Sequence, residues 1–352
     1  MTGELRLVEV DPCTDARWDA LMRDDRGSVF GSPPWLRALV SAYALHIEAR
    51  VLVDRADVVC AGLAFSGLDD LRGRRRISVP FVDRLDPIVQ DHDQWARLAA
   101  PLFDGDDDVD VSLRVLDASV PLDDARLYEH HQLAWHGTDL TRPLDVIRNG
   151  LASGVRSNLR HAERHGVDVH VGSSVEDVRA FHRLHRHTRR HKYGLLAQPL
   201  SFFEAIWAEF SPIGAIDVVM ARLDGEVIAG AMYLQWNDVY YYKFGASIAG
   251  SLAVRPNETV HWAGVVRGLE RGCRLFDWGV SDLDQPGLLR YKQKFATDER
   301  RVSVLRRVGV SPDPRAAEAG RLLGALTALF TAPDVPPEIT EHAGDLLYRY
   351  FA

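Results

Sequence analysis

The sequence predicts an α+β fold made of two tandem domains, each with a mixed, mostly antiparallel sheet flanked by helices. Three observations carry this prediction. The chain has 352 residues, which exceeds the size at which one hydrophobic core usually keeps growing. Hydrophobic residues make up 46% of it, as in a globular protein. The order of helices and strands predicted for the first half recurs in the second half, which indicates a structural duplication.

The first half is predicted to begin with a strand and a helix, followed by a second helix with a clear start signal. Ser32 is placed to cap this second helix, which begins at Pro33 or Pro34 and runs to about Tyr43. The elements predicted for this half are, in order, strand 5–10, helix 14–23, helix 33–43, strands 46–53, 58–65 and 75–81, helix 95–103 and strand 111–115.

The second half is predicted to contain three antiparallel strands joined by two-residue turns. These turns are Asp224-Gly225 and Asn237-Asp238, which are typical hairpin connections. Gly272 is expected to end the helix that follows, as its C′ residue. The elements predicted for this half are helix 154–165, strand 167–171, helices 175–190 and 201–210, strands 215–223, 226–236 and 239–246, helix 257–271, strand 274–278, helix 288–295 and strand 302–308.

From this order we expect domain 1 at residues 1–145 and domain 2 at residues 146–310. The last segment, 311–352, is predicted to be a helical tail that packs back on domain 1. No apolar run approaches the roughly 20 residues that a membrane-spanning helix needs. We see no secretion signal. The three isolated cysteines, Cys13, Cys60 and Cys273, argue against disulfides, so we expect a cytoplasmic protein. We also expect a monomer.

Charge is unevenly distributed along the chain. The net charge is −8, and the acidic run at residues 104–110 contributes to it. Residues 142–192, by contrast, hold eleven Lys and Arg against five Asp and Glu, and residues 288–308 hold seven against two. A basic second half in an acidic chain indicates a ligand that carries phosphate, with solvated arginine faces as the alternative.

Lysine is rare in this chain, since only Lys192, Lys243, Lys292 and Lys294 are lysines among 42 basic residues. An ammonium is a compact, mobile point charge and a guanidinium is a rigid planar fork, so the two are not interchangeable at a reacting centre. The lysines that remain are therefore candidates for chemistry. Two of them lie in the segment 287–295.

Several segments in the same order along the chain resemble the Fem/MurM-type peptidyltransferase group and its GNAT-like relatives. They are Phe30-Gly-Ser-Pro-Pro-Trp-Leu36, Arg74-Arg-Arg-Ile-Ser-Val-Pro-Phe81, the segment from Arg156 to Gly166, Phe276-Asp-Trp-Gly279 and Gly287-Leu-Leu-Arg-Tyr-Lys-Gln-Lys-Phe295. The resemblance implies two tandem GNAT-like acyltransferase domains. It also implies joining of an amino acid, delivered as an ester on tRNA, to the amine of a cell-wall precursor or a small metabolite.

The resemblance also suggests roles for particular residues. It implies that Lys292 of the Tyr291-Lys292 pair lies at the reaction centre, and Tyr291 beside it is expected to bind substrate. It also implies that phosphates of the acceptor are bound around Arg190 and Tyr193. From the residues themselves, Asp277 is a candidate to accept the amine proton, with capping of the next helix as the alternative. Along the third hairpin strand, Tyr242 and Lys243 are predicted to line the acceptor groove. For tRNA we expect contacts from Arg156, Arg160, Arg164 and Arg189.

The donor is predicted to be aminoacyl-tRNA, without a further cofactor. A CoA-dependent enzyme of this fold needs a glycine-rich loop whose amides bind pyrophosphate at a helix N-terminus. Residues 246–257 lack that glycine spacing, and Pro256 removes an amide. An acyl-CoA enzyme and a non-catalytic binding module remain alternatives.

The acceptor is left open between a peptide-like natural product and a peptidoglycan precursor. His191 stands where an arginine is expected, which favours the natural product. His187 and His191 have the i,i+4 spacing of a zinc site, but no Glu completes an H-E-x-x-H arrangement, so we expect no metal. DNA is not an expected partner.

Overall fold

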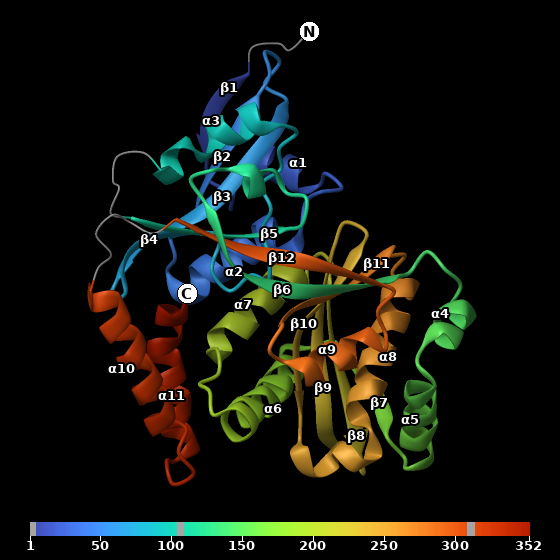
Figure 1. Cartoon of the computed structure of the whole chain (residues 1–352). Helices are drawn as coiled ribbons and strands as arrows, with labels where there is room; N and C mark the ends of the chain where they lie inside the picture. Colours follow the sequence, from blue (N-terminus) through green and yellow to red (C-terminus); the bar gives the residue numbers. More distant parts are fainter. Residues whose placement is uncertain (1–4, 104–108, 308–313) are drawn as a thin grey trace. The chain divides into compact units, whose positions relative to one another are not determined.

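The structure is a computed structural model that describes residues 5–103, 109–307 and 314–352. It divides into two compact units, each of which is described by itself. Unit 1 comprises Met1–Ala134, Arg300–Leu323 and Ala352, and unit 2 comprises Trp135–Glu299 and Gly324–Phe351. Figure 1 shows that each unit contains strands with helices packed beside them.

Unit 1 contains a mostly antiparallel sheet in the order β1-β2-β3-β4-β5-β12. The pairing of β4 with β5 is parallel, and the pairing of β5 with β12 is antiparallel. The elements of this unit are β1 (Arg6–Val10), α1 (Ala16–Met22), η1 (Val29–Gly31), α2 (Pro33–Tyr43), β2 (Glu48–Val53), β3 (Val59–Asp70), β4 (Gly73–Ile77), α3 (His92–Phe103), β5 (Asp110–Leu116), η2 (Val120–Asp123) and β12 (Asp298–Arg307).

Unit 2 contains a sheet in the order β6-β11-β10-β9-β8-β7. Its strands β7 to β10 pair antiparallel in sequence, and β10 pairs parallel with β11. The elements are β6 (Tyr128–Asp139), α4 (Leu144–Gly150), α5 (Ser153–Arg164), β7 (Asp168–Gly172), α6 (Val175–Tyr193), α7 (Leu200–Phe210), β8 (Ile216–Leu223), β9 (Glu226–Trp236), β10 (Val239–Ser247), η3 (Ala249–Val254), α8 (Pro256–Glu270), β11 (Leu275–Asp282) and α9 (Pro286–Gln293).

The predicted helix starts are confirmed by the caps. The Ser32 hydroxyl accepts the first-turn N–H of Trp35 at 3.5 Å, at the start of α2. At α6, Ser174 and Asp177 form a capping box, in which each side chain accepts the backbone N–H of the other residue. Local polar side chains therefore satisfy amides that have no partner within the helix.

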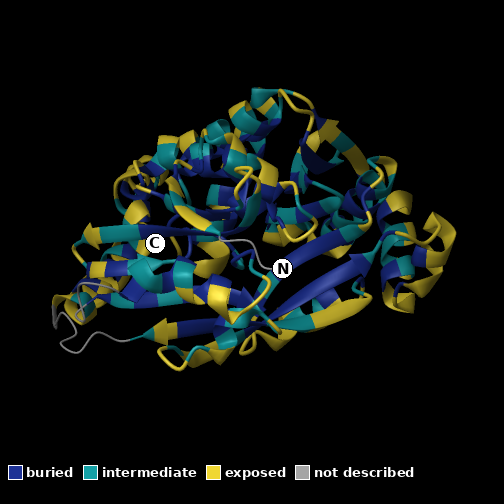
Figure 2. Cartoon of the chain, turned by 90° about the horizontal axis from the view of Figure 1, so that it is seen from above, coloured by how far each residue is buried: buried dark blue, intermediate teal, exposed yellow. Residues whose placement is uncertain are grey.

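Helices α6 and α8 pack on opposite faces of the sheet of unit 2. Met220 of β8 lies on the face where Phe181 of α6 approaches Gly230. The neighbouring residue Val219 belongs to the core that includes Val260 of α8. Since successive side chains of a strand point to opposite faces, the two helices cover the two sides. Figure 2 shows buried residues concentrated on the strands and on the inner sides of the helices.

The boundaries of the two units differ from the predicted boundaries 145/146 and 310/311, the second of which lies outside the described residues. The chain passes from unit 1 to unit 2 within β6, a strand that the prediction missed. The chain returns to unit 1 within β12. This strand was predicted at residues 302–308 as part of domain 2, and residue 308 lies outside the described residues. Instead, Val302 and its neighbours in β12 pair with β5 through Leu116. This pairing joins residues nearly 190 positions apart, so local patterns could not predict it.

The C-terminal tail forms α10 (Pro314–Phe330), α11 (Pro337–Leu347) and η4 (Tyr348–Phe351). The prediction that it packs back on domain 1 is wrong for most of its length, because Gly324–Phe351 belongs to unit 2. There Arg190 donates to the carbonyls of Ala332 at 2.7 Å and Val335 at 2.5 Å, and Arg186 forms an ion pair with Glu341.

The last residue of the tail belongs to unit 1. The Ala352 oxygen accepts hydrogen bonds from Arg72 at 2.9 Å and Arg75 at 3.1 Å. Within the described residues, no helix has the length and apolar character needed to cross a membrane.

Candidate functional site

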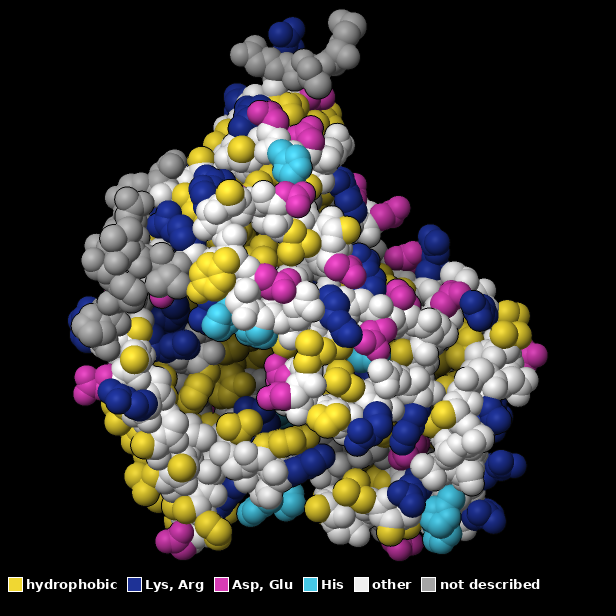
Figure 3. Space-filling model, in the orientation of Figure 1, with side chains coloured by type: hydrophobic (Ala, Val, Ile, Leu, Met, Phe, Trp, Pro, Cys, Tyr) yellow, Lys and Arg dark blue, Asp and Glu magenta, His cyan; other side chains and the backbone are white. Residues whose placement is uncertain are grey.

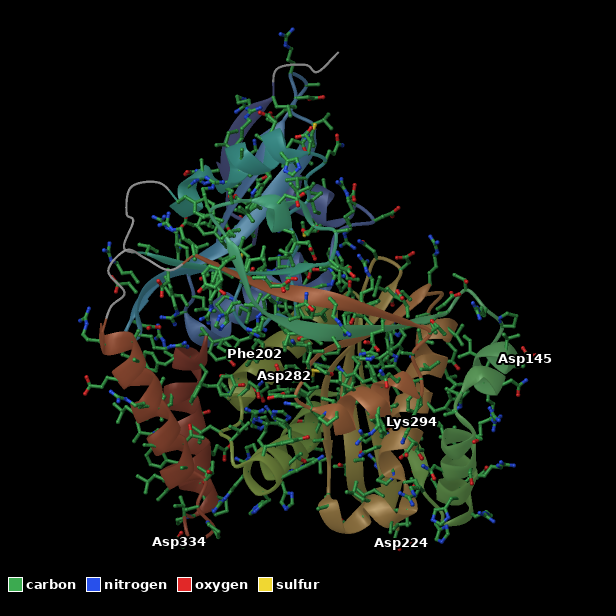
Figure 4. The ribbon with its side chains drawn as sticks, in the orientation of Figure 1. Asp145, Phe202, Asp224, Asp282, Lys294 and Asp334 are labelled. Atoms are coloured by element: carbon green, nitrogen blue, oxygen red, sulfur yellow. The ribbon has the colours of Figure 1, made fainter. Side chains whose placement is uncertain are left out.

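The candidate site of unit 2 lies where two parallel strands separate. β10 and β11 pair only through Val239–Tyr241 and Leu275–Asp277. β10 continues to Ser247 and β11 to Asp282, which is labelled in Figure 4, without further pairing between these two strands. The result is a fork at the C-terminal ends of the strands.

A cavity of about 610 Å³ opens at this fork. Its wall comes from the end of α6, the second half of β10, one residue of β9, the first two turns of α8, the β11–α9 loop and α9. The residues that line it are Thr188, Lys192, Tyr193, Gly230, Tyr242, Gly245, Ala246, Ser247, Asn257, Val260, His261, Gln285, Gly287, Leu288 and Tyr291. Among these described residues there is no carboxylate, and Lys192 is the one Lys or Arg. The cavity therefore favours neutral or anionic groups.

A bulge in β10 brings Tyr242 to the cavity. The register with β9 shifts between Tyr242 and Phe244. Tyr242 packs against His261 of α8, whereas Phe244 packs against Phe203 of α7. A Cβ at Gly245 would lie 2.1 Å from the Tyr242 hydroxyl, so only glycine leaves room for it. The bulge thus directs the side chain of Tyr242 into the fork, with its hydroxyl next to the backbone at Gly245.

The equivalent fork in unit 1 is filled by the segment that follows β4. Ser78 bonds to β5 through both its amide and its hydroxyl, and the Leu85 amide donates to Arg114 at 3.0 Å. Ile88 exchanges two backbone hydrogen bonds with Gly62 of β3, at 2.8 and 2.9 Å. The apolar side chains of this segment, Val79, Val82, Leu85 and Ile88, are buried. Of the two forks, the one in unit 2 is therefore the one open to a ligand.

His261 lies on the cavity wall within a group of aromatic rings. Its ring centroid is 4.9 Å from that of Tyr242 and 5.4 Å from those of Trp278 and Tyr291. Its Nδ1 lies 2.7 Å from the Tyr291 hydroxyl oxygen. Burial, together with the positive charge of Lys292, lowers the pKa of His261 to about 3. The ring is therefore neutral at physiological pH.

Lys292 is buried behind the cavity wall and does not line the cavity itself. Its Nζ donates to the carbonyls of Gly279 at 3.1 Å and Val280 at 2.9 Å. The side chain is only 3% exposed, so it reaches from α9 into the protein rather than into solvent. The ammonium thus joins α9 to the end of β11 and places a positive charge next to His261.

Two further predicted residues, Asp277 and Lys243, also lie away from the cavity. The Asp277 carboxylate is buried and accepts the Gly279 amide at 2.7 Å within β11, and it does not line the cavity as a base would. Lys243 does not line the cavity either, and its Nζ lies 5.7 Å from the centre of the Phe244 ring. The structure therefore does not support the predicted cavity roles of Asp277 and Lys243.

Of the two residues at the end of α6 that were predicted to bind phosphate, Tyr193 lines the cavity and Arg190 does not. Tyr193 lines the cavity and is exposed, and the neighbouring Lys192 lies over its ring at 5.0 Å. Arg190 instead binds the loop between α10 and α11 and lines a separate cavity of about 240 Å³ beside α11. Arg189 donates to the Leu196 carbonyl at 3.1 Å.

Three of the arginines predicted to bind tRNA form one stripe on α5. Arg156, Arg160 and Arg164 follow one another at intervals of four residues and so lie on one side of the helix. Arg156 is held by the carbonyls of Asn149 and Leu151, while Arg160 and Arg164 are exposed. Figure 3 shows Lys, Arg and His side chains gathered where Figure 1 places α5. Arg189, on α6, packs on the other face of the sheet and is not part of this stripe.

The prediction missed several lining residues. His261 and Asn257 of α8, Ser247 of β10, and Gln285 of the β11–α9 loop become neighbours only when the fork forms. Lys192 could have been found, because it is one of the four lysines. In the described residues, no three His, Cys, Asp or Glu side chains are grouped as metal ligands would be.

The comparisons with known proteins first define the fold class. Residues 151–293, which fall within unit 2, match a family described as an acetyltransferase (GNAT) domain. A tandem GNAT protein from the clavulanic acid biosynthesis pathway has a similar fold, with a TM-score of 0.53 and 12% identity, covering 88% of this chain and 100% of that chain. The predicted tandem GNAT-like α+β fold is confirmed.

The resemblance to the Fem/MurM-type group is confirmed as well. The crystal structure of FemX superposes with a TM-score of 0.65 and 13% identity, covering 85% of this chain and 96% of that chain. The UDP-N-acetylmuramoylpentapeptide-lysine N(6)-alanyltransferase of Weissella viridescens is 23% identical over 155 residues, which are 42% of this chain. The chain spans 44% of the length of this relative.

Proposed function

We propose that the protein is an aminoacyltransferase that joins an amino acid from aminoacyl-tRNA to a primary amine by an amide bond. The observation that carries this proposal is the open cavity at the β10–β11 fork, which lacks carboxylates among its described lining residues. An ester is already activated, so the site has to hold the amine and the ester together and stabilise the developing oxyanion. The name of the Weissella relative supports the same reaction class.

The start of α8 supports aminoacyl-tRNA over acyl-CoA as the donor. The helix begins with Pro256, which has no amide hydrogen to donate to an anion. The Glu258 carboxylate is buried in the first turn and accepts the Asn158 amide at 2.8 Å. A pyrophosphate at this helix end would be repelled by the negative charge of Glu258. A helix N-terminus that binds phosphate instead offers backbone amides to it.

We propose that the acceptor is a peptide-like molecule with a primary amine. The Weissella relative is named for transfer to a lysine N6 of a UDP-N-acetylmuramoylpentapeptide, which favours a peptidoglycan precursor. His191, the residue that favoured a natural product, is exposed, and its ring centroid lies 4.5 Å from that of His187. Because it does not line the cavity, it does not decide between the two acceptors.

The proposed function is tested with the whole 352-residue chain and two kinds of donor. It is incubated with tRNA charged with a mixture of amino acids, or with acetyl-CoA and longer acyl-CoAs. UDP-N-acetylmuramoylpentapeptide and lysine peptides serve as acceptors, and mass spectrometry identifies the amide product. We expect an aminoacylated product from charged tRNA. Acyl transfer from CoA without transfer from tRNA would identify the acyl-CoA alternative, and no transfer from either would leave a binding module.

We predict that the stripe on α5 contributes to tRNA affinity through phosphate contacts. The log of the binding constant should fall with log salt by about 0.7 for each phosphate neutralised on a single strand, or about 0.9 on a duplex. Reversing the charge at Arg160 and Arg164 should weaken binding and make this slope shallower by about one to two units. Binding is measured between low and moderate salt with uncharged tRNA.

The matched control is Arg183→Glu, because Arg183 is also exposed but lies on α6, which packs on the other face of the sheet. This reversal should change the affinity less and leave the slope near that of the unchanged protein. Equal effects of both reversals would show that the stripe is not the tRNA contact.

A further inference from the structure

Tyr291 and His261 form a hydrogen-bonded pair inside the cavity. Tyr291 is on α9 and His261 on α8, and the hydroxyl oxygen lies 2.7 Å from Nδ1. Both residues line the cavity and are half-buried. Two helices that are separate in sequence thus place a hydroxyl and an imidazole in contact at the site of the proposed reaction.

Both groups are neutral at physiological pH. Burial holds the pKa of Tyr291 well above its ordinary value, so the hydroxyl keeps its proton. His261, with a pKa of about 3, is not protonated. The hydrogen bond is therefore one between a neutral imidazole and a neutral phenol, and either nitrogen of the ring can carry the hydrogen.

The proposed reaction requires a proton to move between two substrate atoms. The attacking amine nitrogen must lose a proton, and the ribose oxygen that leaves must gain one. No carboxylate lies among the described residues that line the cavity. Asp277, the predicted base, is occupied with the Gly279 amide. Tyr291 offers a hydroxyl at the cavity whose direction the ring nitrogen of His261 can fix, and such a group can both give and accept a proton.

We propose that Tyr291 transfers this proton and that His261 is the residue that positions it. In this arrangement the His261 Nδ1–H donates to the Tyr291 oxygen. The hydroxyl hydrogen and the remaining lone pair of Tyr291 then face the cavity. This inference rests on the function proposed above.

The transfer balances without any further reactant. The amine nitrogen forms a bond to the ester carbonyl carbon, and the bond from that carbon to the ribose oxygen breaks. Tyr291 gives its hydroxyl proton to the leaving oxygen and receives a proton from the nitrogen. The hydroxyl is thereby restored, and His261 stays neutral throughout.

Tyr291→Phe is the first variant of the test, since it removes the hydroxyl and keeps the ring. We expect kcat with charged tRNA to fall at least about a hundredfold, the usual contribution of a positioned acid or base, with KM changed only a few-fold. The matched control is Tyr233→Phe. Its buried hydroxyl donates to the Val260 carbonyl at 3.2 Å and does not line the cavity, so this variant should keep its turnover.

Two substitutions at His261 test the positioning role. His261→Asn keeps an N–H donor close to the place of Nδ1 and should retain most of the activity. His261→Leu removes the donor and should lower kcat about as much as Tyr291→Phe does, with no added loss when both are combined. Thermal unfolding of each variant shows whether the fold is intact. Similar kcat losses in the Asn and Leu variants would overturn the role of His261.

Changing the leaving group of the donor distinguishes proton transfer by Tyr291 from a role in packing alone. An aminoacyl ester of an acidic phenol needs no proton on its leaving oxygen, so the deficit of Tyr291→Phe should shrink several-fold with this donor. An unchanged deficit with both donors, or a kcat within about threefold of the unchanged protein with charged tRNA, would overturn the proposal. If the unchanged protein transfers nothing from charged tRNA, the proposed function fails, and the role of Tyr291 fails with it.

Discussion

Lys292→Met is expected to slow amide formation at least about a hundredfold, because a reacting group that is misplaced by about 1 Å can cost that much. The structure shows why such a displacement is expected. The Lys292 ammonium donates to the Gly279 and Val280 carbonyls, and this contact fixes α9, which carries Tyr291. Methionine fills a similar volume but donates nothing. Turnover with charged tRNA and thermal unfolding are measured on the same preparation.

Two further variants test whether the ammonium of Lys292 is the group that matters. Lys292→Arg keeps the positive charge but should also be slow, because the planar guanidinium cannot take the place of the ammonium between two carbonyls. Lys294→Met should matter much less. Lys294, labelled in Figure 4, is exposed, and its Nζ lies 5.5 Å from the centre of the Tyr291 ring. Near-normal turnover of Lys292→Met with loss in Lys294→Met would show that the wrong lysine was chosen.

Most helices and strands could be predicted because their signals are local. The capping residues Ser32 and Ser174 and the turns at Asp224-Gly225 and Asn237-Asp238 act within a few positions of the elements they end. β6 was missed, since its first half is exposed and polar and its second half is buried without alternation. The division into units also escaped prediction, because it depends on which strands pair over long separations.

The candidate site was predicted in part. Tyr193, Tyr242 and Tyr291 do line the cavity. Arg190 was assigned to phosphate, but the loop between α10 and α11 supplies carbonyls that occupy it. His261 escaped attention because its role comes from contacts of α8 with α9, which no spacing in the sequence reveals. The proximity of residues across helices, rather than their type, was the missing information.

The second large effect is expected on stability, at the buried carboxylate of Asp217. It accepts hydrogen bonds from the Tyr240 hydroxyl and from Arg271 Nε, both at 2.6 Å, and from Arg267 at 3.2 Å. Asp217→Ala would leave the Arg271 guanidinium partly buried without its anion. Removing one partner of a buried ion pair costs about 3–5 kcal/mol, so we expect a loss of this size in urea unfolding. Asp123→Ala, at an exposed carboxylate, is the control.

The same carboxylate should make stability depend on pH. Burial alone would raise the pKa of Asp217, but the hydrogen bonds from Arg271 and Tyr240 outweigh it and hold the pKa below its ordinary value. A carboxyl with a lowered folded pKa contributes stability above its unfolded pKa of about 3.9 and loses it as pH falls through the folded value. The stability difference between the unchanged protein and Asp217→Asn should therefore be constant near neutral pH and shrink below about pH 4. A difference that stays constant to pH 3 would show that this carboxylate does not titrate as the ion pairs require.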